Sequence, residues 1–321
     1  MRRTHSIGYL LVTITVAIGS GLLANFIYWA SEVASCRYTN KPGAYLSYCG
    51  HPLFGNYEHG VFEWEMRSAA IAALKEADII SLGSSVIQVA LSTDAAEAYF
   101  RDIGARPYLF GFSHGEENLF PERLLRRYAP KPKLVIINTD PFFNDRLTDI
   151  AKEVVAGSWS TRLSYWRKQL FIALQPTICN WLQRCPDQIG AIYRRDLTGA
   201  WIWKTVWYPA SAQLPIPESK EYTITISDVA FWTESADRFI AKLGFDRGCI
   251  ILTGTPNSRV DSAAIAASIG QALSIAVVTP HIEGLTTADG GHLSWDSAEK
   301  WSWRFLQDSS EIIRRCLSKS S

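Results

Sequence analysis

Short continuous runs of apolar residues alternate along this chain with stretches of helical composition. The apolar runs predict β-strands at residues 78–82, 108–112, 133–138, 249–253 and 275–279. The segments around them predict helices at 63–77, from about Val86 onward, at 119–128, at 263–273 and at 294–317. Continuous apolar strands that alternate with helices are typical of a parallel sheet covered on both faces. The pattern therefore predicts an α/β protein of three layers, α/β/α, in which the middle layer is a five-stranded parallel sheet.

This alternation is interrupted once. Residues 61–145 and 246–321 carry the predicted sheet, whereas 146–245 differ in composition and 32–60 form an irregular lead-in rich in Tyr, Gly, Pro and Asn. The interruption is expected to be mostly helical, with one strand-like piece from Tyr222 to Ile226. It holds seven of the chain's twelve tryptophans, namely Trp159, Trp166, Trp181, Trp201, Trp203, Trp207 and Trp232. Such aromatic residues suit a sugar-binding cleft, a membrane interface or a small core of their own.

An uncharged apolar segment lies near the N-terminus. Residues 7–30 contain no charged side chain. At helical rise they cover about 36 Å, more than the roughly 30 Å of a hydrocarbon layer. Arg2 and Arg3 precede the segment, and its far end is marked by Phe26, Tyr28 and Trp29. We therefore expect residues 1–31 to form a cytoplasmic stub and a transmembrane anchor, with the rest of the chain on the periplasmic side of the inner membrane.

Two alternatives to an uncleaved anchor are a cleaved signal peptide and a lipoprotein signal ending at Cys36. A signal peptide usually has a shorter apolar core, of about 7 to 15 residues. In the lipoprotein reading, polar Ser31 and Glu32 would separate the apolar run from the lipidated cysteine.

Composition and charge exclude several classes of function. The chain has 321 residues and 47% hydrophobic content, enough to bury a full core. Its formal net charge is +1 with acids and bases interspersed, so it lacks the basic field that holds a nucleic-acid backbone. No His or Cys spacing matches a zinc site. We expect no nucleic-acid partner, no metal and no cofactor.

The cysteines form an even set, as expected for disulfides in an oxidising compartment. Cys36 with Cys49 and Cys179 with Cys185 are the expected local pairs. Cys249 lies in an apolar strand-like run and is expected to be a buried thiol.

Ser85 lies where the first predicted strand turns into a helix. The carboxyl ends of strands in open α/β sheets are where ligands bind. Gly83 allows a sharp turn there. The Ser85 amide would belong to the first helical turn, where it could stabilise a developing oxyanion while the hydroxyl attacks. A serine that only caps the helix gives the same local pattern.

Asp289 and His292 stand three residues apart in Asp289-Gly290-Gly291-His292, just before the last predicted helix. This spacing places both on one side of a tight turn. The carboxylate could then orient the imidazole while the second ring nitrogen faces a serine. A Gly-Gly turn in which Asp289 bonds its own backbone is the alternative.

Taken together, the two segments resemble the SGNH (GDSL-like) hydrolase superfamily, over about half of the chain. The resemblance implies a flavodoxin-like sheet and a catalytic triad of Ser85, His292 and Asp289. Ser84 stands where the family has Asp. This departure is shared by a membrane-anchored branch that includes the teichoic acid D-alanine transfer protein and alginate acetylation proteins, whose Asp-Pro-Phe-Phe run is similar to residues 140–143 here.

The family's oxyanion-hole residues match this sequence only partly. Gly111 or Gly115 could supply the glycine N–H of the second block, and nearby His114 could contact substrate. The third block, Gly-x-Asn-Asp, is absent, which leaves Asn138 and Asn144 as candidates for the oxyanion asparagine. Three other histidines, His51, His59 and His281, are expected to be surface or supporting groups.

These features predict a membrane-anchored extracytoplasmic O-acyltransferase or esterase that acts on a cell-surface polysaccharide. The expected partners are an acylated carbohydrate or another acyl donor and, by resemblance, a membrane-bound O-acyltransferase. A general esterase or lipase for small or lipid esters, and a non-enzymatic glycan-binding accessory protein, are the alternatives.

Overall fold

The computed structural model describes residues 2–33, 41–49, 57–140, 142–182, 191–203, 213–218, 221–257 and 259–319. Its centre is a parallel sheet of five strands in the order β3-β2-β4-β8-β9. The strands are β2 (Ile79–Ser84), β3 (Pro107–Phe112), β4 (Leu134–Asn138), β8 (Ile250–Thr253) and β9 (Ala276–Val277). Each of them lies within two residues of a predicted strand, so the α/β fold with a five-stranded parallel sheet is confirmed.

The order of the strands determines where a ligand can bind. Counted along the chain, the strands lie in the order 2-1-3-4-5, the flavodoxin-like arrangement of a doubly wound sheet. The chain reverses its direction of winding between β2 and β4, and ligands of such sheets bind at this point, beyond the carboxyl ends of the strands. Ser85 follows β2 directly.

Helices cover both faces of the sheet because alternate strand residues point to opposite sides. Ile80 and Leu82 of β2 belong to the core on one face, and Ile79 to the core on the other. The first face packs against α2 (Tyr57–Trp64), α3 (Ser68–Lys75), α6 (Leu119–Tyr128), α9 (Ile226–Leu243) and α10 (Ser262–Leu273). The second packs against α4 (Ser85–Leu91), α5 (Asp94–Asp102), α11 (Trp295–Asp308) and α12 (Ser310–Leu317).

Several helix boundaries differ from the prediction. Helix 119–128 is confirmed to the residue. The predicted helix at 63–77 is instead two helices, α2 and α3, and the predicted helix at 294–317 breaks at Ser309 into α11 and α12. Helix α5 was not predicted as a separate element, although the Thr93 side chain caps it by accepting a hydrogen bond from the Ala96 N–H.

The lead-in and the insertion together build a second, antiparallel sheet of β1 (Ala44–Cys49), β5 (Ala191–Arg195) and β6 (Trp201–Ile202). The prediction of an irregular lead-in is therefore wrong for 44–49, because the strand that pairs with it lies about 150 residues away in the sequence. The predicted strand at 222–226 is also wrong. Thr225 and Asp228 form a capping box that starts α9, and this local hydrogen bonding outweighs the β-propensity of the segment.

A buried ion pair fastens the second sheet to the first. Glu58 of α2 and Arg194 of β5 have fully buried side chains, and their charged groups lie 2.7 Å apart. The Arg194 guanidinium also donates to the carbonyls of Leu109 and Gly111 in β3. Burial alone would raise the pKa of Glu58, but the Arg194 charge and the Ser47 hydroxyl lower it. A charge pair buried with its hydrogen bonds satisfied fixes the two sheets in one relative position.

The remaining helices of the insertion are α7 (Asp149–Ala156) and α8 (Trp159–Leu182). Its tryptophans divide into two groups. Trp201, Trp203 and Trp232 are buried, as expected for a core, whereas Trp159 and Trp166 are exposed on α8. The side chains of Trp181 and Trp207 lie outside the described residues.

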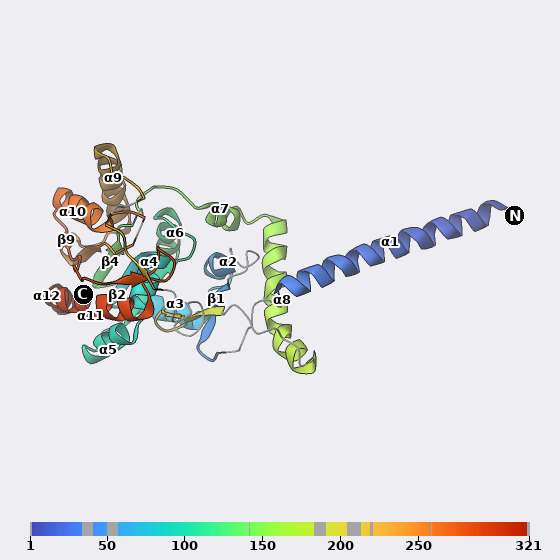
Figure 1. Ribbon diagram of the computed structural model, residues 1–321, viewed down its shortest axis with the longest axis horizontal. Helices are drawn as coiled ribbons and strands as arrows, with labels where there is room; N and C mark the ends of the chain where they lie inside the picture. The colour runs from blue at the N-terminus through green and yellow to red at the C-terminus, as the bar shows by residue number, and fades with distance from the viewer. Residues whose placement is uncertain are drawn as a thin grey trace.

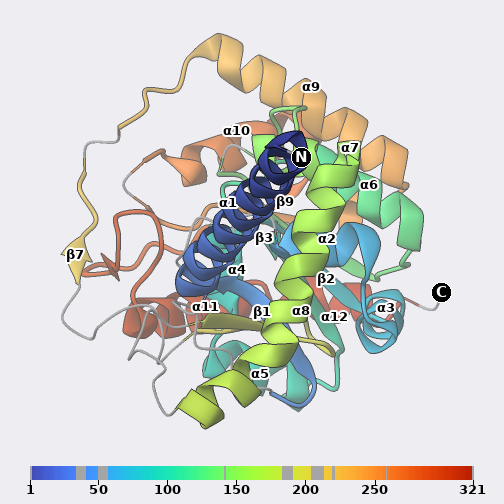
Figure 2. The same ribbon diagram turned by 90° about the vertical axis from the view of Figure 1, so that its right-hand side faces the viewer.

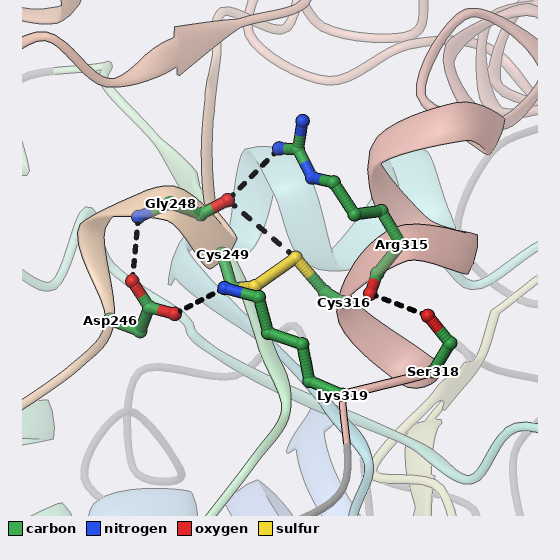
Figure 3. The surroundings of a disulfide bond; sticks show 7 residues. All are labelled: Asp246, Gly248, Cys249, Arg315, Cys316, Ser318 and Lys319. Carbon is green, nitrogen blue, oxygen red and sulfur yellow. Dashed lines mark hydrogen bonds and ion pairs between the residues drawn. A yellow bond between two sulfur atoms is a disulfide. The ribbon is translucent and has the colours of Figure 1, made fainter.

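A disulfide joins Cys249, directly before β8, to Cys316 of α12 (Figure 3). The prediction of a buried thiol at Cys249 is therefore wrong: the residue is buried, but the last helix brings a second cysteine to it. The bond links residues 67 apart, and loop-closure entropy gives it a stabilising effect of about 4 kcal/mol. The predicted pairs Cys36–Cys49 and Cys179–Cys185 involve side chains outside the described residues.

Polar contacts around the disulfide hold the end of the chain in place. Lys319 donates to the Asp246 carboxylate at 2.7 Å, and Arg315 donates to the Gly248 carbonyl at 3.1 Å (Figure 3). The last helix is thus fixed against the segment directly before β8 by both covalent and polar contacts.

The apolar N-terminal segment forms α1 (Arg2–Val33), which projects away from the body of the molecule (Figure 1). The side chains of residues 11–25 are exposed along it. Over the described part of the chain, no helix combines the length and the apolar character needed to cross a membrane.

Candidate active site

Ser85, His292 and Asp289 form one continuous chain of hydrogen bonds. The Ser85 hydroxyl oxygen lies 2.8 Å from Nε2 of His292, and Nδ1 of the same ring lies 2.7 Å from Oδ2 of Asp289. Ser85 and His292 are 207 residues apart in the sequence, so only the fold brings them together. This is the arrangement of a nucleophile, a general base and an orienting carboxylate.

The turn between β2 and α4 positions Ser85. Gly83 has φ +149°, and a Cβ there would lie 2.8 Å from Ile87, so the turn requires glycine. Ser84 caps α4, since its hydroxyl accepts a hydrogen bond from the Val86 N–H. The same hydroxyl donates to the Asp140 carboxylate at 2.6 Å. The residue before Ser85 is therefore held from two sides.

A short closed loop presents His292 and Asp289. The Ala288 N–H donates to the His292 carbonyl at 2.9 Å, which closes the loop between β10 (Thr286–Thr287) and α11. Oδ1 of Asp289 accepts from the N–H groups of Gly291 and His292 while its other oxygen faces the imidazole. The sequence suggested two alternatives, in which Asp289 bonds either its own backbone or the His292 ring. In the structure its two oxygens do both.

The surroundings of Asp289 favour its ionised form. Partial burial by itself would raise its pKa, but the hydrogen bond and charge of His292 and the two backbone N–H groups lower the pKa to about 2. The carboxylate is therefore available to accept from Nδ1, and Nε2 on the other side of the ring faces the Ser85 hydroxyl.

Ser85 and His292 open onto a cleft of about 750 Å³ beyond the carboxyl ends of β2 and β4. The cleft is of the size that binds small ligands or one segment of a polymer. Its walls come from the loops after β3, β4 and β8 and from α9. The lining includes Ser84, Gly115, Glu116, Glu117, Asp140, Asn144, Arg146, Tyr222, Asp228, Phe231, Trp232, Asn257 and Arg259. Another cavity, of about 740 Å³, is lined by residues of α3, α5 and β6 and contains none of the three hydrogen-bonded residues.

Two of the predicted oxyanion or substrate residues line the cleft. Gly115 does so in a turn with φ +64°, and no atom lies within 4 Å of where its Cβ would be. Asn144 also lines it, with its amide donating to Glu117 at 3.0 Å and its carbonyl accepting from Trp232. Both remain candidates for contact with substrate.

The other three predicted residues are not cleft residues. The Gly111 N–H donates to the Gln88 side chain at 3.1 Å, so this amide is already used inside the fold. Asn138 is fully buried, and its carbonyl oxygen accepts from the Thr255 N–H. His114 is exposed and packs edge-on against Tyr48. Contacts with distant segments place all three residues outside the cleft, and such contacts leave no local signal in the sequence.

Asp140 lines the cleft although it was not predicted as a site residue. It lies just past β4, beside β2, and its carboxylate accepts from Ser84 and from the Asn138 amide. Burial raises its pKa to about 6, although these two hydrogen bonds and the His292 and Arg259 charges lower it in part. A signal was present: Asp140 is the first acidic residue after the third predicted strand, at the sheet edge where Ser85 was expected.

Asp140→Asn is expected to stabilise the protein at alkaline pH. An acid whose pKa rises from 3.8 to about 6 on folding is penalised as the pH rises through this range, and a neutral amide is not. The rise in the Asp140 pKa lowers the unfolding free energy of the wild type by about 3 kcal/mol. This loss of stability is fully present above about pH 7 and absent below about pH 4. Urea unfolding of both proteins at pH 8 and pH 4 measures it. An equal difference in unfolding free energy between the two proteins at pH 8 and at pH 4 would contradict the raised pKa of Asp140.

None of the other histidines whose side chains the structure describes takes part in the hydrogen-bonded chain. His59 is fully buried, and its Nε2 lies 2.9 Å from the Glu116 carboxylate. His281 is exposed and lies outside the cleft. His51 falls outside the described residues. His59 thus supports the wall of the cleft through Glu116, which also accepts from Thr148.

Over the described residues, no group of three or more His, Cys, Asp and Glu side chains could hold a metal ion. A scan of protein-family models and searches of curated proteins and of solved structures gave no match to this chain. The interpretation of the site therefore depends on its geometry.

Proposed function

We propose that the protein is an SGNH-like serine acyltransferase or esterase with Ser85 as its nucleophile. The observation that carries this proposal is the unbroken chain of hydrogen bonds from Ser85 through His292 to Asp289 at the wall of a cleft. Nucleophile, base and orienting acid at these distances are the general signature of covalent acyl transfer.

In the proposed reaction, Nε2 of His292 takes the hydroxyl proton as the Ser85 oxygen attacks the carbonyl carbon of an ester. The tetrahedral intermediate collapses, the bond to the leaving alcohol breaks, and His292 returns the proton to that alcohol. The acyl group then remains on Ser85 as an ester. An acceptor hydroxyl, deprotonated by the same imidazole, attacks this ester. The bond between the acyl carbon and the Ser85 oxygen breaks, and His292 returns the proton to Ser85.

The acceptor determines whether the protein is an esterase, with water, or a transferase, with a sugar hydroxyl. Two aromatic side chains of the cleft favour a carbohydrate. Tyr222 and Phe231 are both half exposed and line the cleft, and the Tyr222 hydroxyl donates to Asp228 on the first turn of α9. Exposed rings beside carboxylates suit the apolar faces and hydroxyl groups of sugars. We therefore propose a cell-surface polysaccharide as substrate.

We also propose that the catalytic domain is exported to the periplasm. The Cys249–Cys316 disulfide supports this location, because such bonds persist in oxidising compartments. Attachment to the inner membrane through the N-terminal helix and acyl delivery by a membrane-bound O-acyltransferase remain predictions.

A serine-directed fluorophosphonate tests the proposed nucleophile. The intact mass of the treated wild-type protein is expected to increase by one phosphonyl group, because only an activated serine reacts rapidly. Ser85→Ala is expected to lose the adduct. Ser113→Ala is the matched control: Ser113 follows the neighbouring strand β3, and its hydroxyl makes no hydrogen bond to the residues that the structure describes. An adduct that persists in Ser85→Ala would remove Ser85 from its role and assign the reaction to another serine. No adduct on the wild-type protein would instead favour a non-enzymatic glycan-binding accessory protein.

A further inference from the structure

Helix α8 is apolar on two opposite faces. One face, which includes Tyr165, Phe171 and Ile172, is buried in the main core. A surface helix with one buried face normally presents polar side chains on the other. α8 instead presents a second apolar face to solvent.

This exposed stripe is continuous over four turns. Its members are Trp159, Leu163, Trp166, Leu170 and Leu174, with 40% to 69% of each side chain exposed. Their spacing of three or four residues keeps them within about 80° of the helix circumference. The two indole rings lie edge to face, with their centroids 5.9 Å apart. An apolar patch of this extent on a folded surface indicates that something covers it.

Three features of the molecule indicate a lipid surface. Tryptophan, at two positions of the stripe, is the residue enriched at membrane interfaces. Arg162 and Arg167 flank the stripe on its two sides and are exposed. An apolar face bordered by cations is typical of helices that lie in the interface and approach anionic headgroups.

The third feature is the position of α8 in the molecule. α8 lies across the end of the body from which α1 projects, and both views place the two helices on this same side (Figures 1 and 2). α1 exposes uncharged side chains over residues 11–25. α1 therefore leaves the body at the surface that α8 borders, and both helices expose apolar side chains there. α11 lies at the opposite end of the body (Figure 1).

We propose that the exposed stripe of α8 docks in the interface of a lipid bilayer, with its leucines and indoles among the acyl chains and its arginines at the headgroups. This inference does not depend on the catalytic proposal. It assigns a membrane-facing side to the folded body itself, beyond any attachment through the N-terminal helix.

Quenching of tryptophan fluorescence by brominated acyl chains tests the proposal on the full chain. The protein is reconstituted in vesicles of phosphatidylcholine and phosphatidylglycerol, with and without bromine on the acyl chains. The double variant Trp159→Phe and Trp166→Phe is measured in parallel, so that subtraction from wild type gives the emission of these two indoles. That emission is expected to fall by about half or more in brominated vesicles. All other tryptophans are common to both proteins.

Trp303→Phe is the matched control, because Trp303 is equally exposed but lies on α11, away from α1 and α8. The emission of Trp303, obtained in the same way, is expected to be unchanged by bromination. Equal emission of Trp159 and Trp166 in the two kinds of vesicle would overturn the proposal. If Leu163→Glu with Leu170→Glu also converts a dimer to a monomer in sedimentation experiments, the stripe is an interface between two copies.

Discussion

Ser85→Ala is expected to lower the rate of ester turnover by about 10³-fold to 10⁶-fold while leaving the fold intact. Loss of the nucleophile from a Ser-His-Asp arrangement removes the covalent route and leaves only the contribution of substrate binding and oxyanion stabilisation. The substitution removes one oxygen from a cleft residue, so neither Gly83 nor the capping hydroxyl of Ser84 is disturbed. Release of p-nitrophenol from the acetate ester measures the effect, first in water and then with an oligosaccharide acceptor.

Ser113→Ala serves again as the control, with turnover expected within about twofold of wild type because Ser113 lies outside the hydrogen-bonded chain. A comparison with and without the acceptor also separates the two proposed activities. Faster release of p-nitrophenol together with an acetylated oligosaccharide identifies a transferase, whereas unchanged release identifies an esterase. Undiminished turnover in Ser85→Ala would contradict the proposed function as a whole.

Asp289→Asn is expected to lower the turnover number by about 10⁴-fold. The amide oxygen can still accept from the backbone N–H groups of Gly291 and His292, so the loop should keep its shape. The amide nitrogen, however, would face Nδ1 as a donor. The imidazole would then carry its proton on Nε2 and could not accept the proton of Ser85. Steady-state kinetics together with the thermal unfolding midpoint separate this effect from a loss of structure.

The pH dependence adds a second readout for Asp289. Since its pKa is lowered to about 2, the carboxylate is ionised at every pH above about 3. Asp289→Asn should therefore lose activity by a similar factor at pH 6 and at pH 8. The control is Asp296→Asn, an exposed acid on the first turn of α11, which should retain full activity. A loss confined to one end of the pH range would show that Asp289 does not orient the ring.

Local sequence patterns determined the fold class and the core of the proposed site. Continuous apolar runs predicted all five strands of the parallel sheet, since a strand buried on both faces tolerates few polar side chains. The strand, glycine, serine and helix sequence at Ser85 and the three-residue spacing of Asp289 and His292 are also local. They could be recognised because each depends on the geometry of a single turn.

Other features depended on contacts between distant segments, and these only the tertiary structure decided. The Cys249–Cys316 disulfide needs the last helix to pack beside β8. The strand at residues 44–49 exists because β5 pairs with it, and β5 in turn is held through the buried pair of Glu58 and Arg194. No local propensity encodes which partner a strand or a cysteine will find.

The same distinction applies within the site. Asn138 and Gly111 have residue types suited to an oxyanion hole. Their polar groups, however, are already hydrogen-bonded to Thr255 in the loop after β8 and to Gln88 of α4. Asp140 became a cleft residue because β4 lies beside β2. By itself the sequence determined the candidates Ser85, Asp289 and His292, because each is recognised from its chemical type and its place in a local turn. The tertiary structure decided which of them face a common cleft, because burial and hydrogen-bond partners are set by segments far apart in the chain.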